Sequence, residues 1–199
     1  SVDKRAIDLA KEYEQTDMVA DLRLTSLIQA TENANMKRIN AIISKNPETI
    51  TQIQTPLLDY GFSAFHVAAE EGHTDIIKRF IQAGADPNVH ESRGEKSTPL
   101  HIAAQHGYTQ IVKMLIENGA NPNAQAVSNA TPLQNAVREN DYDITHLLLQ
   151  AGADVNQANE FGMTPLHWAV QQGNKKMTCF LLSRGADVNA QTSEGGTPL

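Results

Sequence analysis

Apolar side chains recur along the chain at the spacing of one helix face. After Gly107, the residues Ile111, Val112, Leu115 and Ile116 form a single stripe on a predicted helix that ends at Gly119. The same stripe occurs in three other segments, as Ile76, Ile77, Phe80 and Ile81, as Ile144, Leu147, Leu148 and Leu149, and as Met177, Phe180, Leu181 and Leu182. A pair of short helices cannot bury such a stripe alone, so we expect the segments to stack on one another.

A shorter helix is predicted before each stripe. Thr98 can cap a helix whose first residue is Pro99, because the N–H group that proline lacks has no partner at that position. This helix should run to about His106, and Gly107 should take the left-handed conformation that joins it to the next helix. The residues at the position of Gly107 in the other segments are Gly72, Asn140 and Gly173.

Two short motifs recur in step with these helices. The first occurs at intervals of 33 residues as Thr98-Pro99-Leu100-His101, Thr131-Pro132-Leu133-Gln134, Thr164-Pro165-Leu166-His167 and Thr197-Pro198-Leu199, and Ser63-Ala64-Phe65-His66 fits it 35 residues upstream of Thr98. The second occurs as Gly84-Ala85-Asp86, Gly119-Ala120-Asn121, Gly152-Ala153-Asp154 and Gly185-Ala186-Asp187, followed by Asn88, Asn123, Asn156 and Asn189. Two motifs that recur with the same period indicate internal repeats.

These motifs resemble the ankyrin repeat, which has a 33-residue period and a T-P-L-H-x-A signature. The resemblance is strong from about Gly61 to the end of the chain and weaker from Arg5 to Thr51. It implies an all-α ankyrin-repeat solenoid of stacked helix-turn-helix units with projecting β-turn finger loops, one of them at 157–163. The finger loops and the first helices would line a concave face.

The repeat pattern divides the chain into units of one array that covers 1–199. We expect a partial, degenerate unit at 1–24, a divergent unit at 25–60, regular units at 61–95, 96–128, 129–161 and 162–194, and the start of another at 195–199. Between Arg5 and Thr31 we prefer one continuous helix to two helices with an immediate turn, because no Gly or Pro marks a break. The pattern begins and stops inside units, which predicts a longer parent protein.

The histidines do not form a pattern typical of a metal or catalytic site. His66, His101 and His167 occupy the same position in successive units, and Gln134 replaces them once. The resemblance implies that this residue hydrogen-bonds to neighbouring backbone and ties the units together. The other histidines lack zinc-binding spacing, and no phosphate-binding loop or nucleophile elbow is present. We therefore expect no catalytic, cofactor or metal site and no enzyme activity in this chain.

Composition and charge narrow the classes of partner. The net charge of −7 and the scattered basic residues argue against nucleic acid and anionic membranes as partners. No apolar run is long enough to span a membrane. The first residues lack the basic-then-apolar layout of a signal peptide, although a targeting segment could lie outside this sequence. The single cysteine, Cys179, excludes an internal disulfide and is compatible with a reducing compartment. We expect an intracellular monomer, in the cytoplasm or alternatively in the nucleus.

Positions that the repeat leaves variable are the candidates for binding a partner protein. They are the finger-tip residues Arg93, Glu95, Lys96, Val127, Ser128, Glu160, Phe161 and Met163 and, at the ends of the first helices, Glu70, Glu71, Gln105, His106, Arg138, Glu139, Gln171 and Gln172. Trp168 should serve mainly in packing, with one edge on the concave face. Large apolar side chains at a projecting tip make Phe161 and Met163 the strongest candidates, unless Phe161 folds back onto its neighbour.

Three hypotheses for function follow. The first is a protein-interaction module that uses a concave face of mixed charge. The second is the substrate-docking or targeting part of a larger enzyme or effector whose catalytic domain lies outside this chain. The third is a structural spacer, which would have no sequence-selective partner.

Overall fold

The computed structural model describes residues 24–45, 53, 61–92 and 94–199. Within these ranges all regular structure is helical, as expected. Residues 24–32 form a helix, and the elements that follow are α2 (Met36–Lys45), α4 (Ala64–Glu70), α5 (Thr74–Gln82), α6 (Pro99–Gln105), α7 (Thr109–Glu117), the 3-10 turn η1 (Val127–Asn129), α8 (Pro132–Arg138), α9 (Tyr142–Gln150), α10 (Pro165–Gln171) and α11 (Lys175–Ser183).

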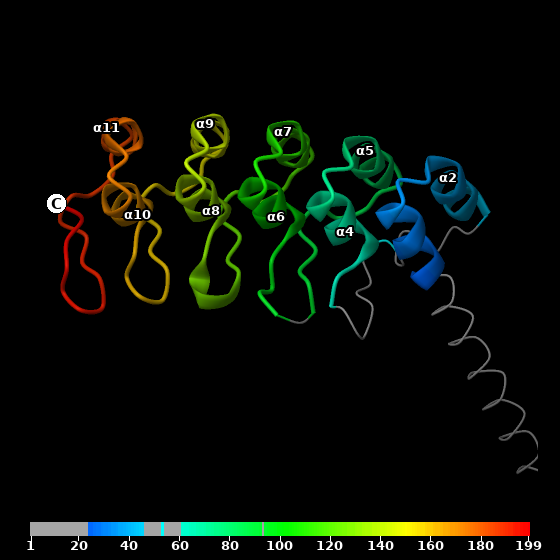
Figure 1. Ribbon diagram of the computed structural model, residues 1–199, viewed down its shortest axis with the longest axis horizontal. Helices are drawn as coiled ribbons and strands as arrows, with labels where there is room; N and C mark the ends of the chain where they lie inside the picture. The colour runs from blue at the N-terminus through cyan, green and yellow to red at the C-terminus, as the bar shows by residue number, and fades with distance from the viewer. Residues whose placement is uncertain (1–23, 46–52, 54–60, 93) are drawn as a thin grey trace, which may run out of the picture.

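The helices stand in two rows (Figure 1). The helix at 24–32 and α4, α6, α8 and α10 form the row of inner helices, and α2, α5, α7, α9 and α11 form the row of outer helices. The inner helices α4, α6, α8 and α10 contact one another in turn, as do the outer helices α5, α7 and α9. Each of these four inner helices also contacts the outer helix of its own pair. The loops at 121–130, 154–163 and 187–196, with the described part of 86–97, project from the inner row as finger loops (Figure 1).

Local sequence sets where the inner helices begin and end. Thr98 has extended backbone angles, φ −93° and ψ 164°, and Pro99 takes the first helical position, as predicted. Gly107 follows α6 with φ 75°, in the left-handed region. Asn140 takes the same role after α8 with φ 57°, because an asparagine tolerates this conformation better than a branched residue does.

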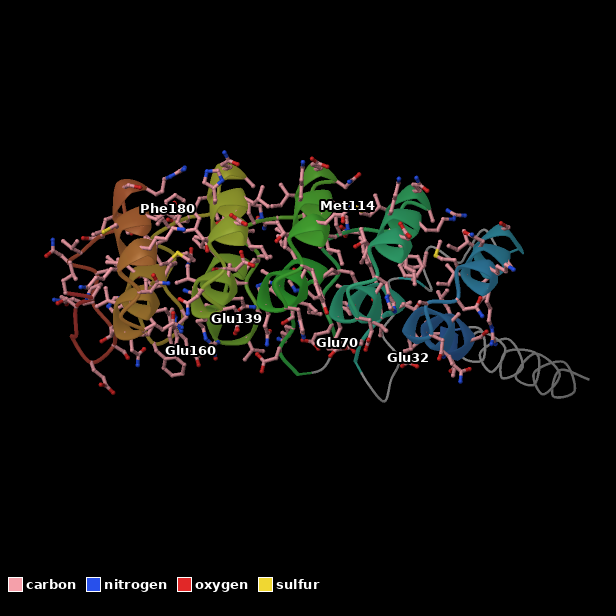
Figure 2. All side chains as sticks on the ribbon, turned by 45° about the horizontal axis from the view of Figure 1, so that its top comes forward. Glu32, Glu70, Met114, Glu139, Glu160 and Phe180 are labelled. Atoms are coloured by element: carbon pink, nitrogen blue, oxygen red, sulfur yellow. The ribbon has the colours of Figure 1, made fainter. Side chains whose placement is uncertain are left out.

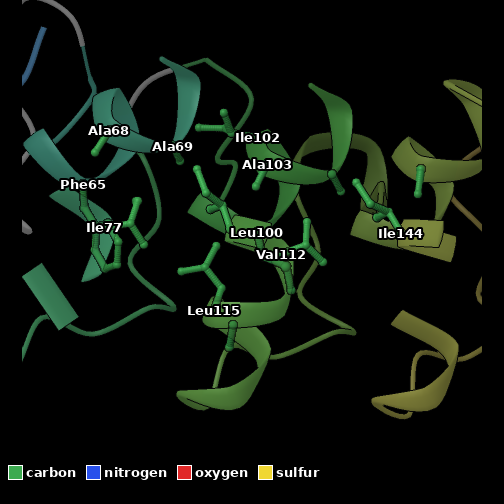
Figure 3. Packing of buried hydrophobic residues seen from close by; sticks show 14 of the residues in the cluster. Phe65, Ala68, Ala69, Ile77, Leu100, Ile102, Ala103, Val112, Leu115 and Ile144 are labelled. Carbon is green, nitrogen blue, oxygen red and sulfur yellow. The ribbon is translucent and has the colours of Figure 1, made fainter. Parts of the chain in front are cut away.

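The core lies between the two rows. The inner helices contribute small side chains such as Ala69 and Ala103, and the outer helices contribute larger ones such as Val112 and Leu115, all fully buried (Figure 3). Alanines let adjacent inner helices approach more closely than adjacent outer helices do. The stack therefore curves toward the inner helices.

The predicted apolar stripes are buried as a set, although not at every position. Ile111, Val112 and Leu115 are buried, whereas Ile116 is half-buried. Phe65 and Phe80 meet edge to face, with ring centroids 6.0 Å apart. The preference for a continuous helix between residues 5 and 31 is tested only at 24–32, which is helical, since the preceding residues lie outside the described part. Among the described helices, none is long and apolar enough to cross a membrane.

Candidate partner-binding surface

Histidines at the start of the inner helices join neighbouring units. The backbone N–H of Thr98 donates to Nδ1 of His101 at 3.2 Å, and the Thr98 hydroxyl lies 2.9 Å from the same nitrogen. Since Nδ1 accepts, the ring hydrogen sits on Nε2, which donates to the carbonyl oxygen of Ala130 at 3.1 Å. His66 and His167 repeat this arrangement toward Ser97 and Gly196. The contacts agree with the tying role that the family resemblance implies.

Burial keeps two of these histidines neutral. Desolvation lowers the pKa of His66 and of His101 to about 4, and it outweighs the hydrogen bonds to backbone carbonyls, which raise the pKa. A neutral imidazole with both nitrogens already hydrogen-bonded has no free lone pair for a metal or a substrate. These side chains are therefore structural.

Gln134 performs the same task without a ring. Its Nε2 donates to the carbonyl oxygens of Gln157 and Met163 at 2.8 and 3.1 Å. In the ranges that the structure describes, no group of three or more His, Cys, Asp or Glu side chains is arranged to hold a metal ion. The consensus position is thus a structural link in each unit.

Asparagines form a second set of links, at the turns that follow the outer helices. The amide of Asn123 donates to the carbonyl of Gly152 at 2.9 Å, and its Oδ1 accepts the backbone N–H of Asp154 at 2.7 Å. The same pair of bonds is made by Asn88 and by Asn156. The recurrence of asparagine was visible in the sequence, but its bridging role was not predicted.

The finger loops are hydrogen-bonded to one another near their tips. The backbone N–H of Val127 donates to the carbonyl of Glu95 at 2.6 Å, and that of Glu160 donates to Ser128 at 2.8 Å. The Ser128 hydroxyl also donates to the Glu160 carboxylate at 2.5 Å. In the last step, Phe161 accepts from the N–H of Ser193. Successive tips therefore form one continuous edge with fixed spacing.

The finger-tip candidates differ in exposure. Phe161 exposes 55% of its surface, which favours the exposed position over folding back onto a neighbour. Val127 exposes 40%, Met163 is half-buried, and Arg93 lies outside the described residues. Among the remaining finger-tip candidates, Ser128 is half-buried, whereas Glu95, Lys96 and Glu160 are exposed.

The candidates at the ends of the inner helices are all exposed and lie along one face. They are Glu70, Glu71, Gln105, His106, Arg138, Glu139, Gln171 and Gln172. Figure 2 shows Glu32, Glu70, Glu139 and Glu160 along this side, while Met114 and Phe180 lie among the outer helices. We call the surface formed by the inner helices and the finger loops the inner face.

An arginine and a tryptophan from adjacent inner helices meet on this face. The Arg138 guanidinium lies over the Trp168 ring, 5.0 Å from its centroid, and the Gln172 amide donates to the Arg138 carbonyl at 2.7 Å. Trp168 is half-buried, and its indole Nε1 is buried without a hydrogen-bond partner. Trp168 thus serves both in packing and as a support for Arg138.

A groove opens at the other end of the inner face, between the helix at 24–32 and α4. Its volume is about 410 Å³, and its lining residues are Thr25, Ile28, Gln29, Glu32, Phe62, Val67, Glu70 and Glu71. This lining carries three carboxylates and no basic residue, so the charge here differs from the mixed charge that we expected. Glu70 and Glu71 were candidates, whereas Ile28 and Glu32 were missed because the unit at 25–60 lacks the Thr-Pro-Leu-His motif. Phe62 and Val67 were missed because their place beside the helix at 24–32 depends on how the two units stack.

A family model described as "Ankyrin repeats (3 copies)" matches residues 7–126, 65–159 and 124–192. The chain belongs to the ankyrin-repeat family. Ankyrin repeats are general protein-protein interaction modules and are typically non-catalytic. The array and the finger loops seen here are those of an ankyrin solenoid.

Two curated relatives match short parts of this ankyrin array. The tRNA endonuclease ANKZF1 of Homo sapiens is 35% identical over 48 residues, which cover 24% of this chain. The ankyrin repeat and SOCS box protein 3 of Bos taurus is 50% identical over 40 residues, which cover 20% of this chain. Each match spans 7% of the relative's length.

Proposed function

We propose that this ankyrin array binds a partner protein through its inner face and finger loops. The observation that carries the proposal is the row of exposed, variable side chains on a scaffold whose units are joined at three levels. Histidines join the starts of the inner helices, asparagines join the turns after the outer helices, and backbone bonds join the finger tips. The backbone of such a scaffold has little freedom left to lose when a partner binds.

Two features of the inner face are typical of binding hot spots. Arginine and tryptophan are enriched at such positions, and the Trp168 ring holds Arg138 in place before a partner arrives. Phe161 offers an exposed apolar side chain at a finger tip whose backbone is fixed by the next finger. We place Arg138, Trp168 and Phe161 at the centre of the contact, with Met163 two residues after Phe161 in the same finger loop.

Quantitative affinity purification with matched variants tests this proposal. The inner-face variant carries Arg138→Ala and Phe161→Ala, and the control carries Lys113→Ala and Cys179→Ala, one exposed cation and one exposed uncharged residue on the outer helices. Proteins captured by the wild-type array should fall about tenfold with the inner-face variant and remain with the control. Equal recovery by both variants would contradict the proposal, and the absence of any selective partner would favour a spacer.

A second candidate function is that the array docks substrates for an enzyme encoded in the same parent protein. One relative that matches this chain is named as a tRNA endonuclease, and the match covers only 7% of its length. An ankyrin segment can therefore be a small part of a protein named as an enzyme, which supports this candidate. Sequencing the full transcript decides between the two, because a catalytic domain would carry motifs that this array lacks. The intracellular location and the monomeric state remain predictions, which fluorescence microscopy and light scattering can test.

A further inference from the structure

The floor of the groove at the N-terminal end of the inner face is apolar. Ile28 and Val67 are each only 8% exposed, and Phe62 is half-buried at its side. The Phe62 ring stacks on the imidazole of His66, with centroids 5.7 Å apart and planes inclined by 21°. Because His66 is itself fixed by the links between units, the wall that Phe62 provides is held in position.

The edges of the groove are acidic. Glu32 comes from the helix at 24–32, and Glu70 and Glu71 come from the end of α4 and the residue after it. These three carboxylates are exposed, and within the described ranges none of them makes a hydrogen bond or an ion pair. Like charges around one groove repel each other, so a cation placed between them would be stabilised.

This combination of floor and rim fits only some ligands. Phosphate groups and acidic segments would be repelled, and a purely apolar group would desolvate the carboxylates without compensating for their charge. Lysine and arginine have an apolar stem and a cationic end, which match the floor and the rim respectively. The groove volume of about 410 Å³ exceeds what one such side chain occupies.

The charge on the rest of the molecule favours the same kind of ligand. On the described inner face, the ends of the inner helices and the finger tips carry the acidic residues Glu32, Glu70, Glu71, Glu95, Glu139 and Glu160 and the basic residues Lys96 and Arg138. The outer helices have the opposite excess, with Lys37, Arg38, Lys78, Arg79, Lys113, Lys175 and Lys176 against Asp75, Glu117 and Asp143. A basic segment would therefore be attracted to the inner face and repelled by the outer one.

We propose that this groove binds a lysine or arginine side chain from a basic, extended segment of the partner protein. The inference rests on the proposed function and gives the chemistry of the partner at one end of the inner face. The stem of the side chain lies on Ile28, Phe62 and Val67, and its cationic end lies among Glu32, Glu70 and Glu71. Exposed carboxylates on a rim contribute mainly to association rate and selectivity, so binding should weaken as salt is added.

Selection of short random peptides by phage display, on three forms of the array, tests this inference. The groove variant carries Glu32→Gln, Glu70→Gln and Glu71→Gln, and the control carries Asp75→Asn, Glu117→Gln and Asp143→Asn, which remove the same charge from the outer helices. Wild type and control should select peptides enriched in lysine and arginine, whereas the groove variant should not. Thermal unfolding of all three forms checks that each is folded.

A fluorescently labelled peptide from the wild-type selection then gives the size of the effect. Its affinity should fall about tenfold or more with the groove variant, and equally when its basic residue is replaced by norleucine or citrulline. If no peptides are selected, if they lack basic residues, or if they bind the groove variant equally well, the inference is wrong. The proposed function is judged separately, by the proteins that the Arg138→Ala, Phe161→Ala variant loses.

Discussion

The Nε2 nitrogen of His101 lies 3.1 Å from the carbonyl oxygen of Ala130 and joins the inner helix of one unit to the start of the next. The other ring nitrogen of His101 accepts from the residue that begins its own helix. A single buried side chain thus fixes the beginning of α6 and the position of the following finger loop. Interactions of this kind contribute to the stability of the array, and the contribution of each can be measured by replacing one side chain.

Replacing His101 should show that its function is to donate one hydrogen bond across units. We expect His101→Ala to lower the free energy of unfolding by about 1–3 kcal/mol, because the Ala130 carbonyl and the Thr98 N–H lose a buried partner. His101→Gln should cost less, since Gln134 makes the equivalent bonds to the next unit from its own position. Urea unfolding of the two variants measures the difference, and an equal loss for both would contradict this role.

The buried histidines His66 and His101 should make the stability of the array sensitive to acid. Their pKa is about 4 in the folded chain and about 6.5 when exposed, so unfolding takes up protons between these values. Above pH of about 6.5 the free energy of unfolding should not be reduced by these histidines. It should fall as the pH drops toward about 4, by at most about 3 kcal/mol for each histidine. Burial of Glu91 raises the pKa of its carboxyl, which acts in the opposite direction.

Unfolding measured from pH of about 4 to about 8 checks this dependence. In a variant with His66→Gln and His101→Gln, the decline on the acidic side should be flatter than in the wild type. A decline of unchanged size in that variant would assign the acid sensitivity to other groups.

Loss of one asparagine bridge should weaken one junction. Asn123→Ala removes the bonds to Gly152 and Asp154, and we expect a loss of about 1–2 kcal/mol in the free energy of unfolding. Asn118→Ala is the control, because the Asn118 amide bonds only to Met114 in its own helix. Hydrogen exchange at the Asp154 amide should speed up in the first variant alone.

Gly162 should tolerate substitution much less well than Gly195. Both have positive φ, 75° and 81°, so alanine is strained at either position, at about 1–2 kcal/mol. A Cβ atom at Gly162 would also lie 2.7 Å from the Gln191 carbonyl oxygen and from Thr192 Cα, whereas at Gly195 it would meet nothing within 4 Å. Gly162→Ala should therefore be the more destabilising, with faster exchange of the Ser193 amide that bonds to Phe161. An equal loss of unfolding free energy in the two variants would contradict this, because it would mean that the finger loop at 187–196 shifts away from a Cβ atom at position 162 without cost.

The parts of the fold that depend on local pattern could be predicted from the sequence. The stripe of Ile111, Val112 and Leu115 gave the outer helix, and the repeated Thr-Pro start gave the inner one, because helical spacing and capping act within a few residues.

The groove and the finger-tip bonds could not be predicted in the same way. The tips are joined through backbone atoms, as between Val127 and Glu95, and no side-chain pattern marks such a bond. Glu32 and Glu70 approach each other only because two helices from different units stack, and the first of them lacks the motif that sets the register. The contact of Arg138 with Trp168 likewise depends on how far one unit is shifted against the next.

The bridges made by Asn88, Asn123 and Asn156 require only a glycine carbonyl and one amide from the following unit. Every junction of this kind is therefore interchangeable with the next. A duplication or deletion of one 33-residue block would still place an asparagine opposite a glycine carbonyl and a backbone amide at the new junction. The length of the array, and with it the reach of its binding surface, can therefore change by whole units while this type of bridge is kept.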